Sequence, residues 1–263
     1  MAFVRVNDVV LHYAVRGKAD APVLVFANSL GTDFRIWEKV AADLAHDYRL
    51  VLYDKRGHGL SDAPPQPYRL DDHVEDLAAL LRHLDITDAV IIGLSVGGMI
   101  AQGLAARHPH LTRALILCDT AHKIGSDAMW NERINAVNAA GIPSLAEAIM
   151  LRWFTPSYRS PDNPDYVGYT NMLTRTPADG YAGTCAALRD ADLTASTSAL
   201  DLPVLCIVGD QDGSTPPDLV RELASLIKGS RFEIIEGAGH IPCVEQPEAT
   251  IALIRNFLDN SIS

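Results

Sequence analysis

The sequence predicts an α/β protein in which a mostly parallel sheet carries helices on both faces and an inserted helical cap. Short apolar runs rich in Val, Ile and Leu recur along the 263 residues, and segments with helical periodicity separate them. One of these runs ends in a serine flanked by glycines, Gly93-Leu94-Ser95-Val96-Gly97, which also begins a helical segment. About 85 residues separate two of the later runs, which is too long for an ordinary connection.

The strands are expected as follows, in chain order. Residues 9–15 alternate in polarity, so we expect them to pair with residues 3–6 as an antiparallel edge of the sheet. The other runs are continuously apolar, which is typical of strands buried on both faces of a parallel sheet. They occupy residues 22–27, 49–53, 89–94, 114–118, 204–208 and 231–235.

The helices are indicated by apolar residues at helical spacing in residues 72–84, 99–107, 217–227 and 248–258. Between the strand that ends at Cys118 and the strand that begins at Val204, helical patterns are interrupted by prolines. We therefore expect a core made of residues 1–119 and 194–263, with residues 120–193 inserted as a helical cap.

The charge balance excludes some classes of partner. The formal net charge is −11 and no basic run offsets it, so a nucleic-acid backbone would be repelled. An anionic substrate would need a locally placed Arg or Lys, because the protein as a whole does not attract it. The first ten residues, MAFVRVNDVV, carry a charge by position 5, and no apolar run approaches the ~20 residues of a membrane span.

The cysteines predict a cytoplasmic protein with reduced core thiols, because none of them forms a C-x-x-C pair. They are Cys118, Cys185, Cys206 and Cys243. Nothing in the sequence implies a cofactor or a metal, since it has no P-loop, no G-x-G-x-x-G after the first strand and no metal-ligand cluster. The oligomeric state is left undetermined.

Ser95 is the candidate nucleophile. It lies between an apolar run and a helix, where a sharp turn projects the hydroxyl into open space, and its flanking glycines keep Cβ atoms away. A serine hydroxyl is a weak nucleophile alone, so this interpretation requires a base, an acid and an oxyanion hole.

The candidate base is His240, in the Gly237-Ala238-Gly239-His240 loop that follows the run of residues 231–235. Glycines there let the backbone turn so that the imidazole can reach the serine. His58 is the only serious competitor, because it also lies on a loop directly after a strand.

The candidate acids are Asp210 and Asp212, which follow the strand of residues 204–208, and Asp119, which follows the strand ending at Cys118. The order Ser, Asp, His along the chain allows all three, and residue chemistry alone does not separate them. Two backbone N–H groups are expected to form the oxyanion hole: Val96, directly after the nucleophile, and Leu30, in the loop after the strand of residues 22–27.

Together these residues resemble the α/β-hydrolase superfamily over the whole chain. In that family's pattern the acid is the third residue after the glycine that closes its strand, and this resemblance implies Asp212. The segment Asp54-Lys55-Arg56-Gly57-His58-Gly59 is similar to the family's D-x-R-G-x-G loop. Many members carry His-Gly where this chain has Asn28-Ser29, a departure that leaves the backbone donor in place.

Four segments resemble a narrower group, the 3-oxoadipate enol-lactonases, and three of them lie in the cap. They are residues 28–33 (NSLGTD), the Trp130-x-x-Arg133 segment, residues 152–154 (RWF) and residues 180–190 (GYAGTCAALRD). The resemblance implies a small anionic lactone as substrate, in the β-ketoadipate branch of aromatic catabolism.

The cap supplies candidates for binding the carboxylate of such a substrate. Arg133 and Arg152 could form bidentate pairs with it, and Trp130 could form an apolar wall. Two other functions compete with this one: a carboxylesterase or lactonase of different specificity, and a ligand sensor that keeps the triad but turns over slowly.

Overall fold

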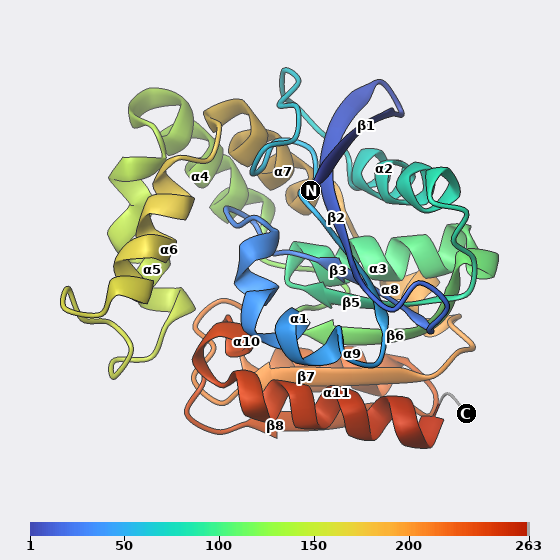
Figure 1. Ribbon diagram of the computed structural model, residues 1–263. Helices are drawn as coiled ribbons and strands as arrows, with labels where there is room; N and C mark the ends of the chain where they lie inside the picture. Colours follow the sequence, from blue (N-terminus) through green and yellow to red (C-terminus); the bar gives the residue numbers. More distant parts are fainter. Residues whose placement is uncertain (262–263) are drawn as a thin grey trace.

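The computed structural model describes residues 1–261, which form one eight-stranded sheet in the order β1-β2-β4-β3-β5-β6-β7-β8 (Figure 1). β1 and β2 form an antiparallel edge, β2 is antiparallel to β4, and the remaining neighbours are parallel. The predicted fold class is confirmed. The strands are β1 (Ala2–Val6), β2 (Val9–Gly17), β3 (Val23–Ala27), β4 (Arg49–Tyr53), β5 (Ala89–Leu94), β6 (Thr112–Cys118), β7 (Val204–Gly209) and β8 (Arg231–Ile235).

Helices cover both faces of this sheet. α3 packs on β3, β5 and β6, α9 packs on β7 and β8, and α2 and α8 lie beside α3, whereas α1 packs on α11 at the other face (Figure 1). The helices of these two layers are α1 (Glu38–Leu44), α2 (Leu70–His83), α3 (Val96–Arg107), α8 (Thr194–Ser198), α9 (Pro217–Leu226) and α11 (Pro247–Ser261). Two 3₁₀ helices, η1 (Phe34–Trp37) and η2 (Pro109–Leu111), and the short α10 (Pro242–Glu245) complete the core.

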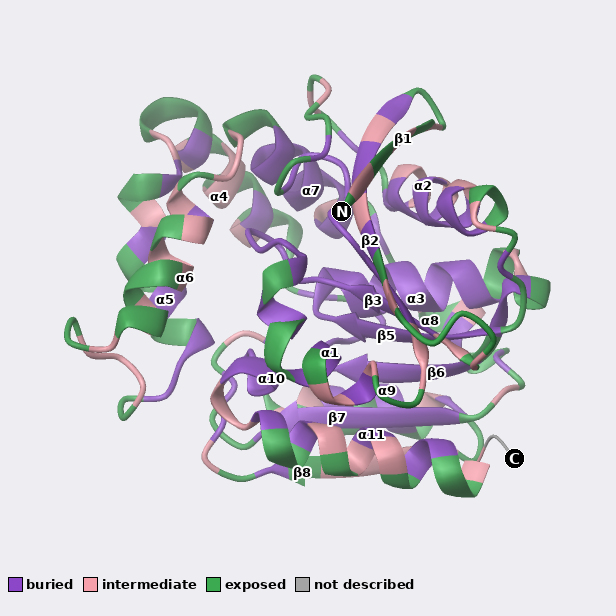
Figure 2. Cartoon of the chain, viewed as in Figure 1, coloured by how far each residue is buried: buried purple, intermediate pink, exposed green. Residues whose placement is uncertain are grey.

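The centre of the sheet is the most deeply buried part of the molecule, as Figure 2 shows for β5 and β7. Every residue of β5 and of β7 is buried, as their continuous apolar sequences predict. The strand β8, at the end of the sheet, is only partly buried. No helix among residues 1–261 is both long and apolar enough to cross a membrane.

The helices predicted from apolar periodicity do not include η1 and α1. α1 has only seven residues, and its buried side chains, Val40, Ala41 and Leu44, are too few to show a clear period. The side chain of Asp33 accepts a hydrogen bond from Arg35 N and caps η1, so this local signal was present in the sequence.

Between β6 and β7 lie the helices of the cap segment (residues 120–193), which stand to one side of the sheet in Figure 1. They are α4 (Asp127–Ala140), η3 (Ile142–Leu145), α5 (Ala146–Trp153), α6 (Pro164–Thr174) and α7 (Ala178–Asp190). α7 meets the core through glycines: a Cβ atom added to Gly180 would lie 2.0 Å from the carbonyl oxygen of Gly57. Only glycine permits this approach, so the cap and the loop after β4 touch backbone to backbone.

Candidate active site

The order of the strands brings four candidate residues to one edge of the sheet. Ser95 follows β5, Asp119 follows β6, Asp212 follows β7 and His240 follows β8, and these four strands are consecutive neighbours. Loops at the carboxyl ends of parallel strands meet at the same edge, which is where α/β proteins build their sites.

Ser95 occupies a strained backbone conformation with φ 58° and ψ −120°. Its N–H donates to the carbonyl oxygen of Cys118 at 3.0 Å, and its own carbonyl oxygen accepts from Thr120 Oγ1 at 2.6 Å. A Cβ atom added to Gly97 would lie 2.1 Å from the carbonyl oxygen of Ala27, so the turn requires glycine there. Strain of this kind persists when the surrounding structure holds it, and it is common at functional sites.

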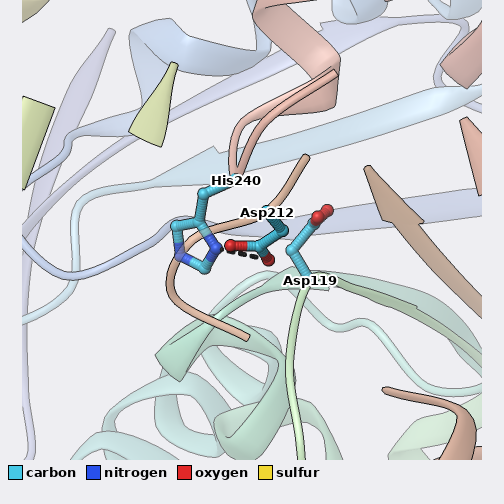
Figure 3. A group of neighbouring side chains, drawn as sticks. All are labelled: Asp119, Asp212 and His240. Atoms are coloured by element: carbon cyan, nitrogen blue, oxygen red, sulfur yellow. Dashed lines mark hydrogen bonds and ion pairs between the residues drawn. The ribbon is translucent and has the colours of Figure 1, made fainter. Parts of the chain in front are cut away.

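His240 and Asp212 form a buried pair, with 2.9 Å between Nδ1 of the imidazole and Oδ2 of the carboxylate (Figure 3). Asp212 also accepts hydrogen bonds from Ser214 N, Thr215 N and Thr215 Oγ1. Burial opposes its charge, yet the pKa of Asp212 is lowered because His240 and these donors favour the carboxylate. An ionised Asp212 holds the proton on Nδ1 and leaves Nε2 as the basic nitrogen.

The other two candidate acids do not bond to His240. Asp210 is exposed, and its Oδ1 accepts from Ala238 N at 3.1 Å in the histidine loop. Asp119 is buried with φ 47°, and its Oδ1 accepts from Gly209 N at 2.9 Å, while Oδ2 has no hydrogen-bond partner. Burial and the neighbouring Asp212 raise the pKa of Asp119 well above its usual range. Of the three candidate acids, Asp212 is therefore the one that bonds to His240, a distinction that residue chemistry alone did not make.

Asp119, Asp212 and His240 each have one metal-ligating atom within 4.8 Å of the others (Figure 3). Both Asp212 oxygens already accept hydrogen bonds, and the Nδ1 of His240 is already bonded to Asp212. We therefore assign no metal to this group.

His58, the competing base, serves a neighbouring loop. Its Nε2 accepts from Gly31 N at 2.9 Å, and its Nδ1 lies 3.2 Å from the carbonyl oxygen of Arg56. Burial lowers the pKa of His58 well below its ordinary value. The imidazole is therefore neutral and holds the loop of residues 28–32, in which Leu30 lies.

The predicted oxyanion donors, Leu30 and Val96, lie on the loop after β3 and at the first residue of α3. Across residues 1–261, neither N–H donates a hydrogen bond to another protein atom. The same described residues contain no hydrogen bond between Ser95 Oγ and His240. Apo enzymes often hold such contacts long until substrate arrives.

In the cap, Trp130 and Arg133 lie together on α4. Trp130 is buried and its Nε1 donates to the carbonyl oxygen of Ile124 at 2.6 Å. The guanidinium carbon of the half-buried Arg133 lies 5.2 Å from the centre of the Trp130 ring. Arg152 is exposed on α5.

Tyr181, on α7, packs against the loop of residues 28–32, and it was not among the predicted site residues. Burial raises the pKa of Tyr181, while the charge of Arg133 and, more weakly, that of Arg152 act in the opposite direction. A Cβ atom added to Gly31 would lie 3.1 Å from Tyr181 Cε2. The GYAG motif in residues 180–183 was the available signal.

Glu245 is a second residue that sequence reasoning missed. Its Oε2 accepts from Gly239 N at 2.7 Å, and its Oε1 accepts from Thr155 N at 3.0 Å and Thr155 Oγ1 at 2.7 Å. Next to this carboxylate, His240 N donates to the carbonyl oxygen of Trp153 at 2.8 Å. The histidine loop and the end of α5 are therefore joined by several hydrogen bonds.

A cavity of about 900 Å³ lies elsewhere, between β2, η1 and α6. Residues that line it include His12, Phe34 and Met172, but not Ser95, Asp212 or His240. The cavity borders residues 33–35, just after the loop of residues 28–32. Because it contains none of the three candidate catalytic residues, we assign the reaction to the edge of the sheet where they lie.

Ser95 stands on a strand-to-helix elbow, and the histidine–aspartate pair follows β7 and β8 at the same edge of the sheet. This arrangement defines a hydrolase of the α/β class. The chain belongs to the α/β-hydrolase fold family, whose sequence model matches residues 22–247.

The narrower resemblance is confirmed by individual relatives. The chain is 40% identical to 3-oxoadipate enol-lactonase 2 of Acinetobacter baylyi over 244 residues, covering 92% of this chain and 91% of that protein. It is 34% identical to 3-oxoadipate enol-lactonase 1 of the same organism over 94% of this chain and 92% of that one. The enol-lactonase from Burkholderia xenovorans superposes with a TM-score of 0.95 at 35% identity, over 98% of this chain and 100% of that one.

Proposed function

We propose that this protein is a serine hydrolase that opens 3-oxoadipate enol-lactone to 3-oxoadipate, with Ser95, Asp212 and His240 as its catalytic triad. The observation that carries the triad is the hydrogen bond between His240 Nδ1 and Asp212 Oδ2, at the sheet edge where Ser95 stands on its elbow. The two relatives from Acinetobacter baylyi, both 3-oxoadipate enol-lactonases, support the choice of substrate.

In acylation, Ser95 Oγ attacks the lactone carbonyl carbon while His240 Nε2 takes the hydroxyl proton. Asp212 stabilises the imidazolium that forms. The N–H groups of Leu30 and Val96 bind the oxyanion of the tetrahedral intermediate, each contributing about 3 kcal/mol. When the intermediate collapses, the ring C–O bond breaks and its electron pair leaves on the enolate oxygen, which takes the proton from His240.

In deacylation, water completes the reaction. The leaving enol stays attached to the acyl chain and tautomerises to the ketone, so nothing departs before hydrolysis. His240 takes a proton from water, the resulting hydroxide attacks the acyl carbon, and the Ser95 oxygen leaves with the proton that His240 returns. The product carries one more carboxylate than the lactone.

The substrate's own carboxylate is proposed to bind at Arg133 and Arg152, beside the wall formed by Trp130. Support comes from Arg133, whose guanidinium carbon lies 5.2 Å from the Trp130 ring centre and whose charge acts to lower the pKa of Tyr181, a residue whose ring packs on Gly31 of the loop of residues 28–32. In a protein of net charge −11, such a cap cation would supply the positive charge that an anionic substrate needs. In this proposal residues 120–193 form the cap that selects the substrate. The cytoplasmic location is a prediction from the cysteines.

The test is steady-state hydrolysis of freshly generated 3-oxoadipate enol-lactone, compared with a neutral aryl ester and with Ser95→Ala as the control. We expect kcat/KM in the range of ~10⁴ to 10⁸ M⁻¹s⁻¹ on the lactone, lost in the variant. Weak turnover of the lactone with good turnover of the aryl ester would keep the triad and make the protein an esterase of other specificity. Absence of turnover on both substrates would favour the sensor.

A further inference from the structure

Two side chains from the loop after β4 hold the loop of residues 28–32. Lys55 Nζ donates to the carbonyl oxygen of Ser29 at 2.5 Å and lies 3.5 Å from that of Thr32. His58 accepts from Gly31 N, and the side-chain amide of Asn28 bonds to the carbonyl oxygen of Thr32. The candidate oxyanion loop is thus fixed at nearly every residue around Leu30.

Lys55 is unusual because its ammonium group is buried yet bonds to backbone carbonyls. The residue is 2% exposed, and within residues 1–261 its hydrogen bonds go to the carbonyl oxygens of Ser29 and Thr32. Burial lowers the pKa of Lys55 to about 7, while Asp54 and Asp33 favour the charged form. Burying an ammonium is costly, so a methionine-like side chain of similar length would serve packing alone at lower cost.

The carbonyl that Lys55 holds belongs to the peptide unit whose other end is the N–H of Leu30. A trans peptide is planar, and its C=O and N–H bonds point in opposite directions. Fixing the Ser29 oxygen on the Lys55 side therefore aims the Leu30 N–H away from Lys55. A charged donor on the carbonyl also polarises the peptide, which strengthens the N–H as a donor.

We propose that Lys55 is a positioning residue for the oxyanion hole, in which its ammonium group fixes and polarises the Ser29–Leu30 peptide. The inference rests on the proposed serine-hydrolase function, in which Leu30 N–H binds the developing oxyanion. It does not depend on which ester is the substrate, because an oxyanion forms with a neutral ester as well as with a lactone.

The first experiment replaces Lys55 by methionine and measures kcat and KM on both the lactone and a neutral aryl ester. We expect kcat to fall about 10- to 100-fold with KM changed less than about threefold, because the oxyanion develops in the transition state and is absent from the bound substrate. The affinity for an arylboronic acid, which forms a tetrahedral adduct with the serine, should fall by a similar factor. Lys39→Met is the matched control, since Lys39 is exposed on α1 and pairs with Asp165.

A folded Lys55→Met enzyme with unchanged kcat, or with lower kcat but full boronate affinity, would overturn the proposal. If the lactone is not a substrate but the aryl ester is, the comparison on the ester still tests Lys55. Failure of the substrate assignment and failure of this inference are therefore distinguishable.

The second experiment covers the case in which Lys55→Met does not fold. The charges that favour the ammonium of Lys55 are those of Asp33 and Asp54, and burial lowers the pKa of the neighbouring His58 and His73, so both imidazoles are neutral. The ammonium is present below the pKa of Lys55, so kcat of the unmodified enzyme should decline as pH rises through about 7 and above. In Lys55→Arg the guanidinium stays charged, and this decline should disappear. A decline that persists unchanged in a folded Lys55→Arg enzyme would contradict the proposal.

Discussion

The backbone N–H of His240 donates a hydrogen bond to the carbonyl oxygen of Trp153 over 2.8 Å, so the candidate base is attached directly to the end of α5. Glu245 reinforces this attachment, because one of its oxygens bonds to Gly239 and the other to Thr155. The position of the cap and the position of the imidazole are therefore linked.

Replacing Glu245 by glutamine should lower kcat on either substrate by roughly tenfold. A carboxamide has one oxygen, so its NH₂ group must face either the Gly239 N–H or the two donors of Thr155, and one anchor is lost. The measurement is steady-state kinetics at saturating substrate. Glu248→Gln is the matched control, because Glu248 is exposed in the first turn of α11, and equal losses in both variants would contradict the linkage.

Asp212→Asn should lower kcat/KM by about 10³- to 10⁴-fold, because an amide can stabilise the wrong tautomer of His240 and cannot stabilise its cation. Asp210→Asn keeps the oxygen that accepts from Ala238 N, so it should stay within about threefold of the parent enzyme. Kinetics of both variants, with circular dichroism to check folding, test the assignment. A greater loss in Asp210→Asn would reverse it.

Arg133→Ala should raise KM for the anionic lactone about 10- to 100-fold and leave KM for a neutral aryl ester nearly unchanged. A hydrogen bond to a charged group contributes roughly 1.5–3 kcal/mol, which sets this range. Arg189→Ala is the control, since Arg189 is also on the cap but pairs with Asp190. An equal rise in KM on both substrates would contradict the proposal that Arg133 binds the substrate carboxylate.

Gly180→Ala should lower the melting temperature by at least about 3 °C and reduce kcat, because the new Cβ would collide with the backbone of Gly57. A Cβ atom added to Gly168 on α6 would meet no atom within 4 Å, so Gly168→Ala should be neutral or stabilising. Thermal unfolding of both variants tests the contact. A stabilised Gly180→Ala protein would show that the two backbones can separate at little cost.

Asp119→Asn should raise the melting temperature more at pH 8 than at pH 4.5. The pKa of Asp119 is raised in the folded protein, so its contribution to stability is fully present below the unfolded pKa and is lost as pH rises toward the folded pKa. Asparagine keeps the acceptor for Gly209 N and carries no charge near Asp212. The rise in melting temperature caused by the substitution should be a few degrees larger at pH 8 than at pH 4.5, at about 2–4 °C for each kcal/mol. An identical rise at both pH values would contradict an unfavourable charge on Asp119.

Local patterns predicted the sheet and the elbow because each is encoded over a few adjacent residues. The apolar run of β5 and the glycines around Ser95 are examples. α1 was missed because seven residues are too few to show a period. The choice among Asp119, Asp210 and Asp212 depended on which carboxylate faces His240, which is a property of the folded loops.

The supporting contacts were out of reach for a different reason. Lys55 meets Ser29 across 26 positions of sequence, and Glu245 meets Thr155 across 90. Lys55 stands in the loop that is similar to the family's D-x-R-G-x-G segment, and Glu245 is the last residue of the short helix α10. Neither residue type at its position indicates which backbone groups it will hold.

The contact between Gly57 and Gly180 has a consequence for protein engineering. It fixes α7 against the core, and the hydrogen bond from His240 N to the carbonyl oxygen of Trp153 fixes the end of α5, whereas α4 carries Trp130 and Arg133, which we propose to contact the substrate. A chimera that exchanges α4 for the corresponding helix of another family member should therefore acquire a new substrate preference while the nucleophile and base keep their registration. Exchanging the whole cap would instead require both anchor points to be transplanted with it.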